Sequence, residues 1–162
     1  MQPARFTGAT APEIQSMKYA AGQTFKKGAV VIYEGGATGN IIEGGVDPAT
    51  VVGVALEAAD SKPGFSLSHD SSVVTRTGNV SEVSVAKANR QTVFSSRMVN
   101  GGTDPVTPVQ ADIGKAYGVL KVGNDWCVDQ SDVVNTRLRV TDIDIDNKIV
   151  FFKWLEAALA TP

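Results

Sequence analysis

The sequence has few of the residues that bind metals or crosslink a chain: its 162 residues include one cysteine, Cys127, and one histidine, His69. A single cysteine cannot form an internal disulfide. A zinc centre needs about four cysteine, histidine or carboxylate ligands, and these two residues cannot complete such a set. The composition therefore excludes disulfide-stabilised scaffolds and zinc modules.

Charge and hydropathy argue against two further kinds of partner. Fifteen basic and seventeen acidic residues give a net charge of −2, and no basic block is present to neutralise phosphates. No stretch approaches the roughly 20 apolar residues that span a bilayer, and the N-terminal residues lack the apolar core of a secretory signal. We therefore expect neither nucleic acid nor a membrane as partner, and a soluble protein that is made in the cytoplasm and stays or is assembled there.

Valine dominates the apolar residues: there are 22 valines and six leucines, with 16 glycines and seven prolines. Valine is stiff at χ1 and suits a pleated sheet, whereas leucine is the better helix former. Short valine-rich runs alternate with turn clusters such as "GGVDPAT" and "NGGTDPVTP". This pattern predicts an all-β fold, a compact β-sandwich or small β-barrel of short antiparallel strands with little helix. The predicted strands are residues 29–34, 51–58, 82–88, 91–96, 115–122, 137–143 and 148–155.

Two features concern domain organisation. Residues 1–20 show no regular apolar period, which predicts an extended N-terminal arm ahead of a β-domain over residues 21–162. The segments "GGVDPATVVGVALEAAD" and "GGTDPVTPVQADIGKAYGVLKVGND" share a Gly-Gly-x-Asp-Pro turn and a later strand that contains Gly-Val. A duplication would divide the β-domain into two related units, about residues 21–88 and 89–162.

The stretch "TDIDIDNK" places Asp142, Asp144 and Asp146 at alternate positions, as the start of an EF-hand calcium loop does. Such a loop also needs glycine at its sixth position and a bidentate glutamate at its twelfth, between two helices. Here Asn147 and Lys153 occupy those positions, and both flanks are β-rich. We therefore predict a hairpin with its turn around Asp146 and Asn147, and no metal site.

Other stretches contain residues that can catalyse reactions. Ser68, His69 and Asp70 are adjacent, but neighbours on an extended chain point to opposite faces and cannot form a catalytic triad. Cys127 would need His69 as its base, and a buried strand position suits this cysteine better. The glycine-rich residues 34–40 are not followed by Gly-Lys-Ser/Thr, so a hairpin loop is expected there. We predict no catalytic, cofactor-binding or metal-binding residue and no small-molecule substrate.

Two long segments resemble small structural proteins of tailed bacteriophages. In "FKKGAVVIYEGGATGNIIEGGVDPATVVGVALEAADSKPG" an apolar strand follows Lys-Gly, and a glycine-rich loop leads to "VVGVALEAAD". In "DIGKAYGVLKVGNDWCVDQSDVVNTRLRVTDIDIDNKIVFFKWL" a strand containing Tyr-Gly leads to a Trp-x-Val-Asp strand, then to a hairpin with a late aromatic strand. The family they resemble is the capsid decoration, or cement, proteins.

The resemblance implies a non-enzymatic virion protein that binds the major capsid protein on the outside of an assembled shell, as a homotrimer at threefold positions. Residues 1–20 and the glycine-rich loops 34–45 and 100–108 would contact the capsid or partner subunits. The aromatic residues within 151–154 would lie in the core and in part of the trimer contact.

Two alternatives stay open. Another virion surface or tail β-domain would bind host glycan through exposed aromatic rings, with Tyr33, Tyr117 and Trp126 as candidates. A small β-fold hydrolase would use His69 or Cys127. Buried aromatic rings would count against the first alternative, and tolerance of substitution at His69 and Cys127 would count against the second.

Overall fold

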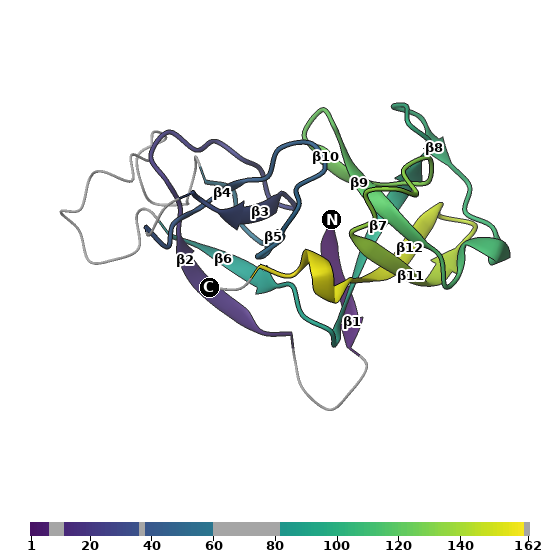
Figure 1. The fold of residues 1–162 in the computed structure, drawn as a ribbon, viewed down its shortest axis with the longest axis horizontal. Coiled ribbons are helices and arrows are strands. Elements are labelled where there is room, and N and C mark those ends of the chain that lie inside the picture. Colours follow the sequence, from purple (N-terminus) through teal and green to yellow (C-terminus); the bar gives the residue numbers. More distant parts are fainter. Residues whose placement is uncertain (7–11, 36–37, 60–81, 161–162) are drawn as a thin grey trace.

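The structure is a computed structural model that describes residues 1–6, 12–35, 38–59 and 82–160. Its regular structure in these residues is almost entirely β, which confirms the predicted fold class. The strands form two sheets that lie side by side (Figure 1). They are β1 (Gln2–Phe6), β2 (Ile14–Lys18), β3 (Val30–Tyr33), β4 (Ile41–Glu43), β5 (Gly53–Ala55), β6 (Glu82–Lys87), β7 (Thr92–Val99), β8 (Pro105–Val106), β9 (Ala116–Val122), β10 (Asp125–Asp129), β11 (Leu138–Asp144) and β12 (Ile149–Trp154), with the short 3-10 helices η1 (Gln110–Asp112) and η2 (Glu156–Ala158).

The first sheet contains β2, β6, β5, β3 and β4 in this order, and each pair of neighbours is antiparallel. Its two edge strands approach each other just after β2. There a parallel bridge joins Tyr19 to Ile41 of β4, and the amide of Ala20 donates to the Ile41 carbonyl at 2.9 Å. The sheet is therefore strongly curled, and its edges meet at one end.

The second sheet closes on itself. Its strands run in the order β7, β10, β9, β11 and β12, and β12 pairs again with β7. The long strand β7 allows this, because its residues 94–97 pair with β12 while Met98 and Val99 pair with β10. The sequence predicted antiparallel strands only, but β7 and β10 are parallel, since β8, η1 and β9 provide the long crossover that parallel pairing needs. A small barrel results, with β1 and β8 attached to β7.

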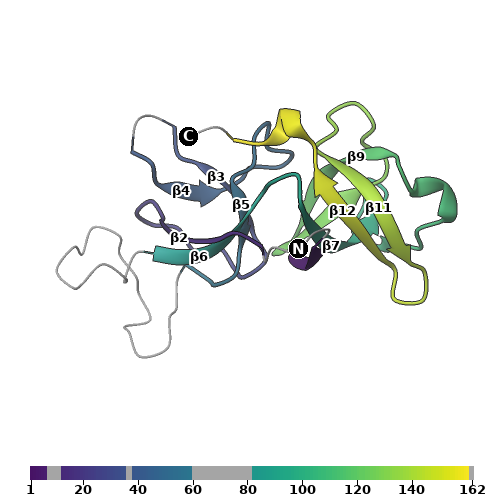
Figure 2. The ribbon, with the colours of Figure 1, turned by 90° about the horizontal axis from the view of Figure 1, so that it is seen from below.

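The N-terminal segment folds back onto both sheets. β1 pairs with β7, and β2 pairs with β6, both antiparallel. Figure 2 shows β2 alongside β6 and the N-terminus next to β7. The described parts of residues 1–20 are extended, as predicted, but they form strands that the sequence did not predict and pair within this chain. The signal in β2 is weak because four of its five side chains are exposed, so apolar alternation is missing.

One hydrophobic core runs through both sheets, and valine is its commonest residue. In the barrel, the rings of Phe94, Phe152 and Trp154 pack together with centroids 5.5, 6.1 and 6.2 Å apart. Trp126 is 1% exposed and Trp154 is 3% exposed. The predicted core position is thus confirmed for Phe152 and Trp154, whereas Phe151 is only half-buried. Trp126 is also a core residue.

The seven predicted strands each overlap an observed strand, and β11 and β12 form the predicted hairpin. Its turn consists of residues 145–148. The Asp144 carboxylate caps this turn by accepting hydrogen bonds from the amide of Asn147 at 3.0 Å and from its Nδ2 at 2.9 Å. The positive φ of the turn, 56°, falls on Lys148 rather than on the aspartate or asparagine, which tolerate it better.

A bulge in β11 decides which way its carboxylates face. The register with β12 shifts between Val140 and Asp142, so Thr141 is an extra residue. Strict alternation would otherwise place Asp142 and Asp144 on the same face as buried Val140. Because of the bulge, Ile143 packs against the core and the two aspartates lie on the other face.

The chain passes from one sheet to the other between β6 and β7, near residue 88, where the repeated sequence pattern suggests a boundary. Both repeated segments place a buried glycine before valine in a strand. A Cβ on Gly53 would lie 2.2 Å from the Ala86 carbonyl oxygen, and a Cβ on Gly118 would lie 2.3 Å from Asp132 Oδ2. Each position therefore needs glycine, because a Cβ would clash with a different neighbouring residue in each case.

Candidate functional site

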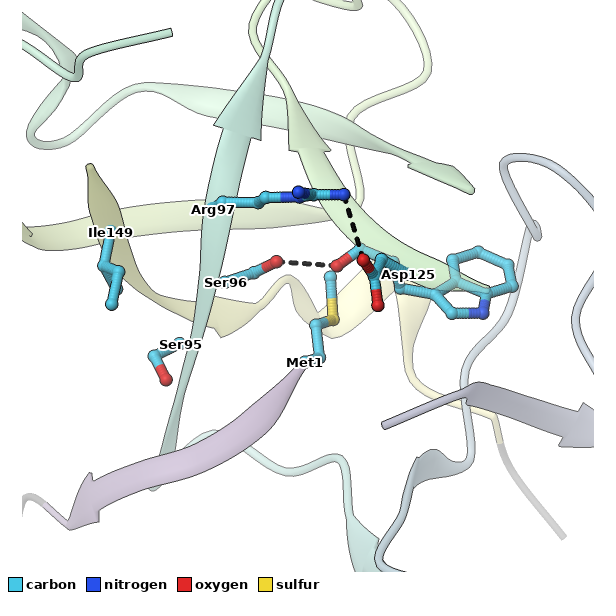
Figure 3. Close-up of a pocket in the computed structure, with 7 residues that line it drawn as sticks. Met1, Ser95, Ser96, Arg97, Asp125 and Ile149 are labelled. Carbon is cyan, nitrogen blue, oxygen red and sulfur yellow. Dashed lines mark hydrogen bonds and ion pairs between the residues drawn. The ribbon is translucent and has the colours of Figure 1, made fainter. Parts of the chain in front are cut away.

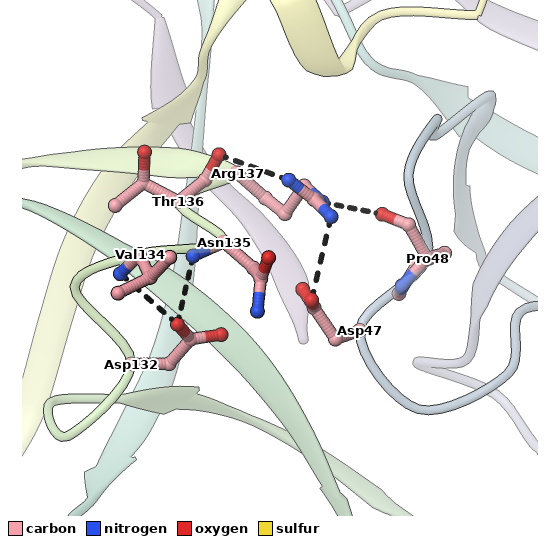
Figure 4. A network of polar contacts seen from close by, with 7 residues as sticks. All are labelled: Asp47, Pro48, Asp132, Val134, Asn135, Thr136 and Arg137. Carbon is pink, nitrogen blue, oxygen red and sulfur yellow. Dashed lines mark hydrogen bonds and ion pairs between the residues drawn. The ribbon is translucent and has the colours of Figure 1, made fainter.

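Two loops, one from each sheet, meet in the structure (Figure 4). Residues 44–50 follow β4, and residues 130–137 connect β10 to β11. Arg137 joins them: its Nε donates to the Pro48 carbonyl oxygen at 2.7 Å, and its Nη2 lies 3.3 Å from Asp47 Oδ2. The Arg137 and Asp47 side chains are only 19% and 20% exposed. We call these two loops together the loop face.

Asp47 has three unusual features. Its φ is 52°, in the left-handed region that few residues with a side chain adopt, although aspartate tolerates it better than most. Its Oδ1 is buried and has no hydrogen-bond partner among the described residues. Burial raises the pKa of its carboxyl, and the nearby carboxylates of Asp132 and Asp129 add to this effect, although Arg137 opposes it. Such features persist where the surrounding structure holds them in place, and they cluster at functional sites.

Asp132 shapes the second loop. Its Oδ1 accepts hydrogen bonds from the amides of Val134 at 3.2 Å and Asn135 at 2.9 Å, as aspartate does in tight turns. Its carbonyl oxygen accepts a hydrogen bond from the amide of Gly118 at 2.8 Å. The loop conformation is therefore held by its own side chain and by contact with β9.

The loop face exposes three valines. Val46 is 68% exposed, Val133 64% and Val134 84%. They are three of the six large apolar residues that are strongly exposed in the described part of the chain. Val133 and Val134 are adjacent in the chain, and exposed apolar residues that form a patch mark interaction sites. A loop held in place by its own contacts loses little entropy on binding. This arrangement can bind an apolar patch on another protein.

A second link between the sheets lies next to the loop face. Trp126 Nε1 donates to Glu43 Oε1 at 3.1 Å, and Lys121 Nζ lies 2.8 Å from the same oxygen. Gly44 follows Glu43 directly, and a Cβ there would lie 3.4 Å from the Trp126 indole. These contacts hold the start of residues 44–50 against the second sheet.

A pocket of about 300 Å³ lies on the barrel (Figure 3). Its polar groups bind one another: Ser96 Oγ donates to the Trp126 carbonyl oxygen at 2.6 Å, and Arg97 Nη2 lies 3.0 Å from Asp125 Oδ2. A serine nucleophile needs a base that accepts its proton, and a carbonyl oxygen is not one. The Ser96 hydroxyl is therefore not an activated nucleophile. The lining residues are Met1, Ser95, Ser96, Arg97, Asp125, Trp126 and Ile149.

Asp112 is a buried carboxylate with a complete set of hydrogen bonds. Its Oδ1 accepts from the Tyr117 hydroxyl at 2.6 Å and from Gln130 Nε2 at 3.1 Å, and its Oδ2 accepts from the Val109 amide at 2.8 Å. Burial alone would raise the pKa of Asp112, but these hydrogen bonds lower it below its ordinary value. Burial, followed by the bond to Asp112, raises the pKa of Tyr117 well above its ordinary value. The network connects η1 to β9 and is structural.

The structure describes only some of the residues that resembled catalytic or metal sites. Ser68, His69 and Asp70 lie outside the described residues. Cys127 is fully buried in β10, which confirms the predicted buried strand position, and its Sγ accepts a hydrogen bond from Arg97 Nε at 3.3 Å. Within the described ranges no three histidine, cysteine or acidic side chains gather into a metal site. No helix in those ranges is long and apolar enough to cross a membrane.

The loops expected to contact the capsid are partly described, and two of the three aromatic rings expected to bind glycan are buried. Residues 34–45 lie partly outside the described residues, and residues 101–105 are exposed. Tyr117 is 2% exposed and Trp126 is 1% exposed, so neither ring can stack on a glycan. Tyr33 is half-buried, and Lys87 Nζ lies 5.7 Å from its ring centroid.

Comparison with known proteins does not assign a family. The chain matches no protein-family model, no curated protein sequence and no solved structure.

The loop face was not predicted from the sequence. A signal was present in "SDVVNT", where two valines stand between turn-forming polar residues, and in the turn "GGVDP". Nothing along the chain relates Asp47 to Arg137, because their contact forms only when the two sheets pack together.

Proposed function

We propose that this chain is a non-enzymatic structural protein of a bacteriophage virion, which binds the major capsid protein on the outside of an assembled capsid and stabilises the shell. The loop face carries this proposal. Its exposed valines Val46, Val133 and Val134 are held in place by the Arg137–Asp47 pair, which suits docking onto another protein. In the pocket of Figure 3, by contrast, the Ser96 hydroxyl donates to a carbonyl oxygen and not to a base.

The segments that resemble cement proteins also support the proposal. The first contains β3, β4 and β5, and the Trp-x-Val-Asp segment of the second is β10, followed by the β11–β12 hairpin. These segments form strands and a late hairpin, which is compatible with the proposal.

In this proposal the loop face, and not the N-terminal segment, makes the main contact. β1 and β2 pair with β7 and β6 within this chain, so they form part of the fold rather than a free arm that reaches a neighbouring protein. A homotrimer would present three loop faces around a threefold position of the shell. Three linked contacts can bind ~10²- to 10⁴-fold more tightly than one.

Co-sedimentation with empty capsids of the parent phage tests the proposal. The double substitution Val133→Ser/Val134→Ser should leave the protein folded and weaken binding at least about tenfold, because each buried valine contributes ~1.5 kcal/mol or more. The matched control is Val109→Ser, which changes a valine that is 51% exposed outside the loop face. Equal binding by both variants would contradict the role of the loop face, and no binding by the unmodified protein would contradict the function.

Light scattering tests the trimer separately. A mass of three chains is expected in solution or on the shell, and a monomer in both places would reject this part of the proposal. The glycan alternative has less support because two of its three candidate rings are buried. Binding to a glycan array without binding to capsids would favour that alternative.

A further inference from the structure

The chain contains two Asp-Pro bonds, one in each of its Gly-Gly-x-Asp-Pro turns. The first joins Asp47 to Pro48 in the loop face, and the second joins Asp104 to Pro105 at the start of β8. Acid breaks Asp-Pro bonds more easily than other peptide bonds. The aspartate carboxyl can attack its own carbonyl carbon, and the proline nitrogen, which belongs to a tertiary amide, takes up a proton more readily than other amide nitrogens. Because both bonds have the same chemistry, the structure around each one decides how fast it reacts.

The backbone at Asp47 has an unfavourable conformation. Its φ is 52°, whereas steric contact with the proline ring restricts a residue before proline to extended conformations with negative φ. Aspartate tolerates the left-handed region better than most residues, but the proline adds its own restriction. Asp104 is exposed, and its φ is not positive. Breaking the first bond would therefore release strain of a kind that is not present at the second.

The Asp47 carboxyl has one oxygen that is available for reaction. Its Oδ2 lies 3.3 Å from Arg137 Nη2, but its Oδ1 is buried and has no hydrogen-bond partner among the described residues. An oxygen of this kind gives up no hydrogen bond when it attacks a carbon atom. The carbonyl carbon of Asp47 belongs to the same residue, so no second group has to be brought to the bond.

The proline side of the bond is held as well (Figure 4). Pro48 is buried, and a Cβ on Gly44 would lie only 3.2 Å from its ring. Arg137 Nε donates to the Pro48 carbonyl oxygen at 2.7 Å, so Arg137 contacts both residues of the bond. Strain of this kind persists only where the surrounding structure holds it, and it can prepare a group for reaction.

The charges around Asp47 decide when its carboxyl is neutral. Burial raises its pKa, the guanidinium of Arg137 opposes this effect, and the carboxylates of Asp132 and Asp129 add to it. The net result is a raised pKa, so the neutral carboxyl is present at a higher pH than in an ordinary aspartate. The neutral form carries the proton that the proline nitrogen needs.

We propose that the bond between Asp47 and Pro48 cleaves itself in mild acid while the protein is folded. The neutral carboxyl of Asp47 transfers its proton to the Pro48 nitrogen, and a carboxyl oxygen forms a bond to the Asp47 carbonyl carbon. The C–N bond breaks with its electron pair on the nitrogen, which leaves Pro48 with a free amino group. Water then opens the cyclic anhydride on Asp47 to two carboxyl groups, so the net reaction is hydrolysis.

The cut would change the loop face without separating the two parts of the chain. β2 pairs with β6 and β3 pairs with β5, and both pairings cross the cut. The parts should therefore elute together in gel filtration. The inference goes beyond capsid binding by the loop face and does not depend on it.

Mass spectrometry of the denatured sample measures both bonds in one experiment. Fragments 1–47 and 48–162 report the first bond, and fragments 1–104 and 105–162 report the second. At the lowest pH at which circular dichroism still shows the native fold, the first bond should break at least about fivefold faster, which corresponds to ~1 kcal/mol in the barrier. In urea at the same pH both bonds should break at similar rates, because the structure that distinguishes them is lost.

Matched variants assign the reaction to the Asp47 carboxyl. Asp47→Asn should stop acid cleavage at the first bond, and Asp104→Asn is the control that should leave it unchanged. If Asp47→Asn does not fold, Pro48→Ala replaces it and should slow cleavage strongly, because the nitrogen of an ordinary amide takes up a proton less readily.

Three results would overturn the proposal. The first is cleavage of the folded protein that is no faster at the first bond than at the second. The second is undiminished cleavage at the first bond in Asp47→Asn or, where that variant does not fold, in Pro48→Ala. The third is the loss of cleavage when protease inhibitors are added, since a contaminating enzyme would then cut the chain.

Discussion

The guanidinium of Arg137 lies 3.3 Å from the carboxylate of Asp47, and this contact joins the two sheets of the molecule. Both side chains are about four-fifths buried. The ion pair between Arg90 and Glu156 is the opposite case, because its side chains are 68% and 70% exposed. The two pairs should therefore differ in their contribution to stability.

Arg137→Ala should lower the free energy of unfolding by about 2–4 kcal/mol, because it removes the hydrogen bond to Pro48 and leaves the Asp47 carboxylate without its counter-charge. Arg90→Ala should change it by less than ~1 kcal/mol, because exposed ion pairs contribute little. Urea denaturation of both variants measures the difference. Equal losses would mean that Arg137 does not hold the loop face.

Tyr117→Phe tests the buried network. It removes one hydrogen bond to Asp112 and should cost about 1–2 kcal/mol at neutral pH. The lowered pKa of Asp112 means that its stabilising effect is present above the unfolded value of about 3.9 and is lost as the pH falls through the folded pKa. The variant should therefore lose less stability in acid than the unmodified protein, as measured by urea unfolding across this range. Tyr33→Phe is the control, and an identical acid profile for all three proteins would contradict the prediction.

Asp47 should show the opposite pH dependence. Its folded-state pKa is raised, so the native state holds the proton more tightly than the unfolded chain does. The Asp47 carboxylate therefore lowers the free energy of unfolding as the pH rises from the unfolded pKa of about 3.9 through the folded pKa. Asp47→Asn should remove this pH-dependent loss of unfolding free energy. Carboxyl-carbon NMR measures the pKa directly, and a midpoint for Asp47 at or below the ordinary value would refute the prediction.

Lys148→Gly should stabilise the hairpin between β11 and β12. Lys148 has a φ of 56°, which glycine adopts without the steric cost of a Cβ. The expected gain in the free energy of unfolding is about 0.5–1 kcal/mol, after the greater freedom of glycine in the unfolded chain is counted. Lys148→Ala keeps the Cβ and should give no gain. Thermal unfolding of both variants decides, and a similar change in both would show that backbone strain is not the cause.

Deletion of residues 1–18 should unfold the protein or destabilise it severely, because it removes β1 from β7 and β2 from β6. An arm that only reaches a partner would leave stability unchanged. Circular dichroism and a thermal scan distinguish the two cases. Gln15→Ala keeps the β2 backbone and changes only an exposed side chain, so it should be tolerated. A fully stable truncated protein would show that β1 and β2 contribute nothing to the fold.

The strands that the sequence did not predict share a physical cause. β2 is mostly exposed, β4 has three residues and β8 has two, so none shows enough alternation for a strand signal. β10 was expected from the resemblance to phage proteins and from the strand position predicted for Cys127, but not from an alternating pattern. Its four buried residues form a continuous run, which by itself does not distinguish strand from helix.

Within β11, too, the sequence alone does not show on which face the carboxylates lie. The sequence places Asp142 and Asp144 in step with Val140, and only the extra residue Thr141 puts them on the other face. A bulge depends on the partner strand as well as on the strand that contains it. The sequence of β11 alone therefore could not reveal it.

By itself, the sequence determined the all-β class, the approximate positions of seven strands and the late hairpin, because valine-rich alternation and turn chemistry act over a few neighbouring residues. It also indicated the buried position of Cys127. Only the tertiary structure decided that β7 pairs with both β10 and β12, that Arg137 meets Asp47, and that Arg139 lies opposite Lys153. These relationships depend on the register and packing of residues far apart in the chain, and no local pattern in a single sequence encodes them.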